Sequence, residues 1–270
     1  MLLPFPYGLG AALALFIAFP ILLRKRMMNR MRGGPGGTIL TGVDLSGMDL
    51  TGMILRGADL SGMDLTYTIL TRADLSHTIL TGADLSTVVF HKTILRGADL
   101  TDTILTGANL AGMDLTGTIL RGSHLTGANI SEAILMGVDL SGMDLSDTIL
   151  ARADLSNTIL DGTDLSGIDL TGAILTNTDL TGTILTGVDF TGVNLSGSKL
   201  MGVDLSGMIL TDAMLYRANL TGANLSGADL TGATILRTTL FQTNLTNADL
   251  TGATIVNTIL NCVGHPICVD

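Results

Sequence analysis

The 270-residue sequence has no tryptophan, and aromatic residues make up only 3% of it. Charged residues account for only 14% of the chain. An ordinary globular core is not expected from this composition, because aromatic side chains normally supply much of the buried area of a core. Hydrophobic residues nevertheless reach 46%, which is too many for a disordered polar protein. The apolar residues must therefore be organised in another way.

Side chains that carry catalysis are also scarce. The chain has 4 histidines, which do not cluster, and Glu132 is its single glutamate. No serine lies in a G-x-S-x-G sequence, and no glycines have the G-x-x-x-x-G-K-[ST] spacing of a phosphate-binding loop. We therefore expect a noncatalytic protein, with no catalytic residue, metal site or cofactor.

The C-terminal sequence NCVGHPICVD leaves two readings open. Cys262, His265 and Cys268 are each three residues apart, but a structural zinc site needs four ligands, so Asp270 or a second chain would have to supply the fourth. Alternatively, residues 261–270 form a short cap over the end of the core, whose two cysteines could pair in an oxidising compartment.

A large apolar residue recurs at every fifth position from Leu40 to Leu260 without a break. An α-helix repeats its faces every 3.6 residues and a strand every two, so a period of five fits neither element. A smaller residue, such as Ala58 or Thr78, stands two positions before each large one, and glycine usually stands two positions after it. In an extended segment the large and small residues point to one side, while glycine lets the chain turn. Repetition of this unit predicts an all-β solenoid with leucines inside.

The repeats include the pentapeptides ADLSG, ANLTG, ADLTG and ANLAG. This pattern resembles the A(D/N)LXX motif of the pentapeptide-repeat proteins over residues 38–260. The resemblance implies a right-handed quadrilateral parallel β-helix with four pentads in each coil of twenty residues. The tripeptide TIL, which recurs at 38, 78, 118 and 158, agrees with a coil of this length. The repeats would form about eleven coils and a rod about 50 Å long, since neighbouring strands lie about 4.8 Å apart.

The first 37 residues differ from the repeats. Residues 2–23 carry no charge and are long enough to span the hydrocarbon core of a bilayer, which is about 30 Å thick. A basic cluster follows, formed by Arg24, Lys25, Arg26, Arg30 and Arg32. We expect residues 1–26 to hold one transmembrane α-helix with its basic flank at the membrane surface, and residues 27–37 to form a basic, Gly/Pro-rich linker. The repeats of this single-pass membrane protein would then lie on the cytoplasmic side; a cleaved signal peptide is the alternative.

The repeats are acidic, because 18 aspartates occupy the outward position before the large residue, from Asp44 to Asp249. The simplest interpretation is a solvated surface that discourages aggregation. Some members of the family, however, are acidic rods that occupy the DNA-binding surface of DNA gyrase. The alternative function is therefore a DNA mimic that binds gyrase or another topoisomerase.

Isoleucine takes the same outward position in fourteen other repeats, where the family prefers Asp or Asn. On a coil of twenty residues Ile54, Asp74 and Ile94 fall on one face, so apolar and acidic residues alternate. The simpler interpretation is that isoleucine is a good strand former at a tolerant position, since scattered apolar residues need no function. We predict instead that this face packs on a protein partner, a second copy of the chain or the membrane surface, and binds no nucleic acid, which makes the protein a membrane-anchored scaffold or interaction module. The candidate residues are Ile54, Arg56, Ile94, Arg96, Ile134, Met136, Ile174, Met214, Tyr216 and Leu236.

Overall fold

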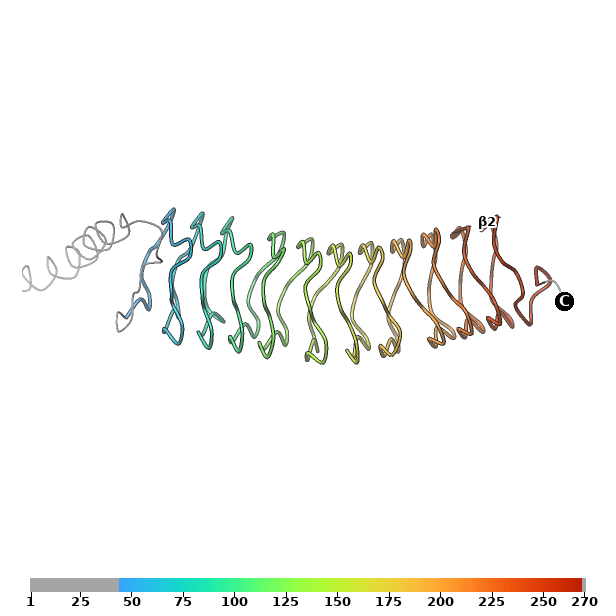
Figure 1. Cartoon of the computed structure of the whole chain (residues 1–270), viewed down its shortest axis with the longest axis horizontal. Coiled ribbons are helices and arrows are strands. Elements are labelled where there is room, and N and C mark those ends of the chain that lie inside the picture. The colour runs from blue at the N-terminus through green and yellow to red at the C-terminus, as the bar shows by residue number, and fades with distance from the viewer. Residues whose placement is uncertain (1–43, 269–270) are drawn as a thin grey trace, which may run out of the picture.

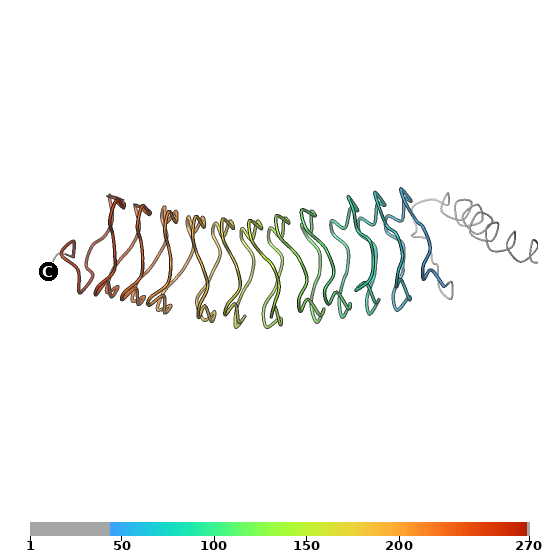
Figure 2. The same ribbon diagram turned by 180° about the vertical axis from the view of Figure 1, so that it is seen from behind.

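The computed structural model describes residues 44–268 of the chain. Figures 1 and 2 show that these residues wind into similar coils stacked along one axis, so that the two ends of the described chain lie at opposite ends of a rod. This shape is expected of a repeat in which each unit can bury its apolar residues only against its neighbours.

Nearly every described pentad ends in a tight turn. The carbonyl oxygen of Leu50, for example, accepts a hydrogen bond from the amide of Met53 at 3.0 Å. The third residue of that turn, Gly52, has a φ of +67°, which is the left-handed conformation that a type II turn requires at this position. Glycine adopts it without the steric cost that a β-carbon brings, which explains why glycine recurs with the repeat.

Successive coils pair through parallel β-bridges between residues twenty positions apart. At the start of the rod these bridges are Asp49–Ile69, Ile54–Asp74, Asp59–Ile79 and Asp64–Asp84. They take up four consecutive pentads, so the predicted coil of twenty residues is confirmed. Among the described residues, the pairing extends into named strands only near the C-terminal end, where β1 (Thr234–Leu236) lies parallel to β2 (Thr254–Val256).

The interior of the rod is a ladder of leucines, as the five-residue period predicts. From Leu45 to Leu245 the large residue of each pentad has at most 3% of its surface exposed. Where the smaller inward residue is a threonine, its hydroxyl is satisfied by the backbone; Thr78 Oγ1 donates to the carbonyl oxygen of Leu75 at 2.6 Å. Within residues 44–268 no buried side-chain nitrogen or oxygen lacks a hydrogen-bond partner. The core therefore avoids the cost of burying an unpaired polar group.

The C-terminal end of the core is covered only in part. Leu250, Ile255 and Leu260 pack against the core but are half-buried, unlike the leucines before them. Cys262 and Cys268 are joined by a disulfide with an S–S distance of 2.10 Å. The residues expected to form the cap thus hold a covalent loop at this end of the rod.

The segments expected before the repeats, the membrane segment at 1–26 and the linker at 27–37, lie outside the described residues. Between residues 44 and 268, no helix has the length and apolar character that crossing a bilayer takes.

Candidate interaction surface

The ten candidate residues lie along one side of the rod. Their central positions share a row because β-bridges connect residues twenty apart, as Ile54 to Asp74 and Asp74 to Ile94. The row contains Ile54, Ile94, Ile134, Ile174 and Met214. The corner two residues later carries Arg56, Arg96, Met136, Tyr216 and Leu236. These ten residues are called the Ile54 face below.

Along the Ile54 face, well-exposed side chains alternate from coil to coil with side chains that are largely buried. Ile54 is 71% exposed, and Ile94 and Ile174 are 46% and 37% exposed. In intervening coils, Ser76 and Ser156 at the following corner are only 8% exposed. Isoleucine side chains that stand out from every second coil form an apolar ridge, and burying such a ridge against a partner is favourable.

The aspartates between these isoleucines have a structural role that the sequence analysis missed. In all 18 repeats with an outward aspartate, its Oδ1 accepts a hydrogen bond from the amide two residues later. At Asp74 the donor is the amide of Ser76, at 3.0 Å. This is an Asx turn, and the recurring Asp-Leu-Ser/Thr sequence was the signal that could have predicted it. Aspartate therefore holds the corner as well as facing solvent, which isoleucine cannot do.

These hydrogen bonds favour the ionised carboxylates. The pKa of Asp59 is lowered by hydrogen bonds from the hydroxyl and the amide of Ser61. At Asp74 partial burial acts to raise the pKa, but hydrogen bonds from Ser76 and Arg56 and the charge of Arg56 outweigh it, so the pKa is lowered. Arg56 forms an ion pair with Asp74 at 2.7 Å. The surface therefore keeps its negative charge well below neutral pH.

The alternation of isoleucine and aspartate also separates the negative charges. Like charges directly opposite each other on neighbouring strands destabilise a sheet, and the coils are only about 4.8 Å apart. Within residues 44–268 four β-bridges join two aspartates, namely Asp64–Asp84, Asp144–Asp164, Asp169–Asp189 and Asp229–Asp249. Most other outward aspartates pair with an uncharged residue. The acidic rows are therefore interrupted on every face.

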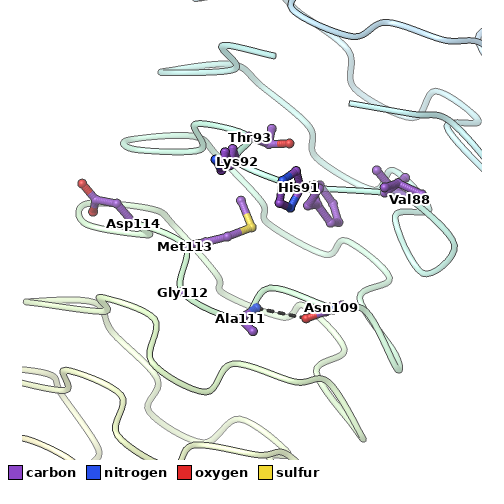
Figure 3. Close-up of a pocket in the computed structure, with 11 residues that line it drawn as sticks. Val88, His91, Lys92, Thr93, Asn109, Ala111, Gly112, Met113 and Asp114 are labelled. Carbon is purple, nitrogen blue, oxygen red and sulfur yellow. Dashed lines mark hydrogen bonds between the residues drawn. The ribbon is translucent and has the colours of Figure 1, made fainter. Parts of the chain in front are cut away.

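A hollow of about 490 Å³ opens in the side of the rod beside this face. Figure 3 shows it between two segments of successive coils, residues 88–93 and 109–114. The buried side chains of Phe90 and Met113 reach it from inside, and the exposed His91 and Lys92 stand at its edge. No backbone hydrogen bond joins residues 88–95 to residues 108–115, all of which the structure describes. The two coils are thus locally unpaired.

Neither the hollow nor any other part of the described chain assembles a metal site. From residue 44 to residue 268, no group of three or more His, Cys, Asp or Glu side chains is placed to hold an ion. Cys262 and Cys268 are bonded to each other, so the zinc reading of the C-terminal sequence loses two of its ligands.

The basic cluster expected at the membrane surface, Arg24, Lys25, Arg26, Arg30 and Arg32, lies outside the described residues.

Comparison with known proteins finds matches along almost the whole repeat region. The family model described as "Pentapeptide repeats (8 copies)" matches in overlapping segments that together run from residue 37 to residue 261. No curated protein matches the chain in sequence.

Three solved structures illustrate the relatives. HetL, a pentapeptide repeat protein involved in heterocyst differentiation regulation from the cyanobacterium Nostoc sp. strain PCC 7120, is 31% identical, with 92% of this chain and 98% of HetL covered and a TM-score of 0.35. QnrB1, a plasmid-mediated fluoroquinolone resistance protein, is 18% identical, with 73% and 91% covered and a TM-score of 0.33. A pentapeptide repeat protein from the Arabidopsis thaliana thylakoid lumen is 29% identical, with 48% and 77% covered and a TM-score of 0.17.

Proposed function

The chain belongs to the pentapeptide-repeat family, and from this premise we propose that it is a noncatalytic interaction module whose rod binds a protein partner along the Ile54 face. The observation that carries the proposal is the apolar ridge, in which isoleucines between 37% and 71% exposed recur in one row. Proteins that remain monomeric rarely expose long contiguous apolar patches, and larger ones mark interaction sites.

The test replaces the ridge by charge. The triple variant Ile94→Asp, Ile134→Asp and Ile174→Asp is expected to abolish the crosslinked species that the full chain forms with its partner in native membranes. The matched control, Ile79→Asp, Ile119→Asp and Ile159→Asp, alters residues on the adjoining row that are 42% to 52% exposed and should leave that species intact. Crosslinking that survives in the first variant, or disappears equally in both, contradicts the assignment of this face.

We further propose that residues 2–23 tether the rod to a membrane, with the basic cluster at residues 24–32 holding the repeats on the cytoplasmic side. The Cys262–Cys268 disulfide is the opposing observation, because disulfides persist mainly in oxidising compartments. Protease protection of the full chain in sealed vesicles of known orientation decides the side. If a carbonate wash releases the chain from the vesicles, residues 2–23 do not span the membrane and the proposed tether is wrong.

The alternative function is an acidic rod that occupies the nucleic-acid site of DNA gyrase or another topoisomerase. Its support is the ionised surface of outward aspartates, whose pKa values, as at Asp59 and Asp139, are lowered by hydrogen bonds from the following serines. The interruption of every acidic row by uncharged residues weighs against it, since duplex DNA carries a charge about every 1.7 Å. Inhibition of gyrase supercoiling by the purified chain at micromolar concentration would favour this alternative over the scaffold.

A further inference from the structure

The Ile54 face changes character along the rod. In the first coils the corner residues are Arg56 and Arg96, whereas further along they are Met136, Tyr216 and Leu236. The corner residues are therefore basic in the first part of the face and apolar in the second, although the isoleucine row continues through both. Because the two parts of the face differ in chemistry, we expect each part to contact a different partner.

The opposite edge of the face also carries basic residues, and at this corner position the later Arg152 pairs with Glu132. Arg72 and Lys92 occupy the same corner position in successive coils, and both are exposed. Neither forms an ion pair with a carboxylate among residues 44–268, while Arg56 is already engaged by Asp74. Of the six Lys and Arg residues among residues 44–268 that form no ion pair, three lie in these coils, namely Arg72, Lys92 and Arg96, and the others are Arg121, Arg217 and Arg237.

Large apolar side chains are exposed among these cations. Tyr67 is 71% exposed at a corner of the rod, and Ile69 and Val89 are bridged to each other on the side next to the Ile54 face. Together with Ile54 and Ile94 they flank Arg72 and Lys92. Below, the N-terminal patch means Ile54, Tyr67, Ile69, Arg72, Lys92 and Ile94. Exposed apolar side chains interspersed with unpaired cations are the chemistry of surfaces that rest on anionic lipid headgroups.

The sequence that leads into the rod supplies a second argument for a lipid partner. The basic cluster ends at Arg32, and the described rod begins at Asp44. Even a fully extended chain of that length reaches no more than about 40 Å. If residues 2–23 are held in a membrane as proposed above, the first coils are the part of the rod that must lie near its surface.

We infer that the N-terminal patch lies against an anionic lipid surface, with Arg72 and Lys92 at the phosphates and Tyr67 among the headgroups. This inference rests on the proposed membrane tether. It leaves the apolar part of the Ile54 face, from Met136 to Leu236, free for the protein partner. The rod would thus approach the membrane through its first coils and present its later coils for binding.

The absence of tryptophan from the chain allows a direct test. Tyr67→Trp places a single tryptophan in the N-terminal patch, and Tyr216→Trp places one on the later, apolar part of the Ile54 face. Each full-length variant is reconstituted with vesicles of equal parts phosphatidylglycerol and phosphatidylcholine, in which the phosphatidylcholine is brominated or not. Bromolipid should quench most of the emission at position 67 and leave that at position 216 unchanged.

Reversing the charges of Arg72 and Lys92 shows whether these cations bind the lipid or only lie near the membrane. Adding Arg72→Glu and Lys92→Glu to Tyr67→Trp should lower the lipid-contacting population by more than tenfold, since each cation near an anionic surface contributes about a factor of five. The same loss of quenching is expected in vesicles of phosphatidylcholine alone. The circular dichroism spectra should be unchanged, because all these side chains are exposed.

Flotation of the vesicles distinguishes the two ways in which the inference could fail. If the chain floats with the vesicles but the tryptophan at position 67 is not quenched, the patch is not a lipid surface and the tether stands. If the chain does not float, the tether is wrong and the inference falls with it. If quenching persists after charge reversal, the electrostatic contact with lipid is refuted.

Discussion

The contacts between successive coils, called junctions here, differ along the rod, and two neighbouring junctions that share residues 88–95 show this. At the regular junction, residues 68–75 pair with residues 88–95 through five backbone hydrogen bonds, whose donors are the amides of Leu70, Arg72, Leu75, Val89 and Ile94. At the open junction, between residues 88–95 and 108–115, the corresponding amides of Phe90, Lys92, Leu95, Asn109 and Asp114 make none of these bonds. The hollow of Figure 3 lies there, and Figures 1 and 2 show the wider spacing after the third described coil. The repeat alone therefore does not guarantee that coils pair.

The inward residues at the two junctions explain the difference. Ala73 stacks on Thr93 at the regular junction, whereas Thr93 stacks on Met113 at the open one. In this row, from Met53 to Ala253, Thr93 and Met113 form the only stacked pair in the described chain that contains no alanine. This pair needs more room than the alanines leave elsewhere in the row, and the backbones are unpaired beside it.

The same order of residues recurs at other unpaired positions. The β-bridges expected at 119–139, 124–144, 149–169 and 184–204 are missing from the described coils. The inward pairs beside them are Thr118 with Val138, Ser123 with Met143, Thr148 with Ile168, and Thr183 with Val203. Thr68 with Val88 is an exception, because its junction is paired. A hydroxyl residue followed one coil later by a larger apolar residue therefore favours opening without always causing it.

Amide hydrogen exchange should show the largest contrast between the two junctions. The five amides of the regular junction can exchange only when the coils separate, whereas those of the open junction make no hydrogen bond to the next coil. We expect exchange on the order of a thousandfold slower at the regular junction, since opening of a paired core costs several kcal/mol. Equal protection of the amides of Leu75 and Leu95, measured by NMR, would show that the open junction is paired in solution.

Ala73→Met should destabilise the regular junction. It places a large side chain directly over Thr93, and overpacking of a core costs about 1–3 kcal/mol of unfolding free energy. Urea unfolding measures the loss, and exchange at Leu75 should accelerate. Ala153→Met is the matched control, because Ala133 and Ala173 lie on either side of it and leave room. A similar loss in both variants would mean that the size of the stacked neighbour does not decide pairing.

The difference between the junctions shows which features of the fold the sequence predicts and which it does not. The five-residue period predicts that Leu75 and Leu95 are buried and that coils pair every twenty residues, because both follow from backbone geometry. The open junction depends on how the side chains of Thr93 and Met113 fit together across coils, and the exception at Thr68 shows that size alone does not predict it. The row of the Ile54 face was predictable for the same reason as the core. The Asx turns had a signal in the recurring Asp-Leu-Ser/Thr sequence, and the disulfide was one of the two readings of the C-terminal sequence, but the hollow required the side-chain positions.

Met113→Ala should close the open junction. Truncation of a buried methionine usually costs about 2–5 kcal/mol, but here the coils can approach and re-form hydrogen bonds, each of which contributes about 1 kcal/mol. We expect a net loss of less than about 1 kcal/mol in urea unfolding, together with new protection at Leu95. Met53→Ala is the control, because Met53 is in the same row, is also 6% exposed and adjoins a paired junction. Equal losses from the two truncations would contradict closure.

The smallest expected contrast concerns the two aspartates on either side of Ile94. The lowered pKa of Asp74 reflects hydrogen bonds from Ser76 and Arg56 that outweigh partial burial, and Asp114 is lowered in the same way, with Arg96 acting only through its charge. Because both pKa values are lowered on folding, each carboxylate stabilises the fold above its unfolded pKa, and this contribution disappears as the pH falls through the folded pKa.

Arg56→Gln should therefore raise the pKa of Asp74 more than Arg96→Gln raises that of Asp114, because only Arg56 forms an ion pair with its aspartate, at 2.7 Å. The corresponding loss of stability near neutral pH is a few tenths of a kcal/mol, since exposed ion pairs contribute little. Carbon-13 titration of the two carboxylates measures both shifts. Equal shifts would mean that Arg96 reaches Asp114 across the open junction as closely as Arg56 reaches Asp74, so that loss of backbone pairing there would not loosen the surface charges above it.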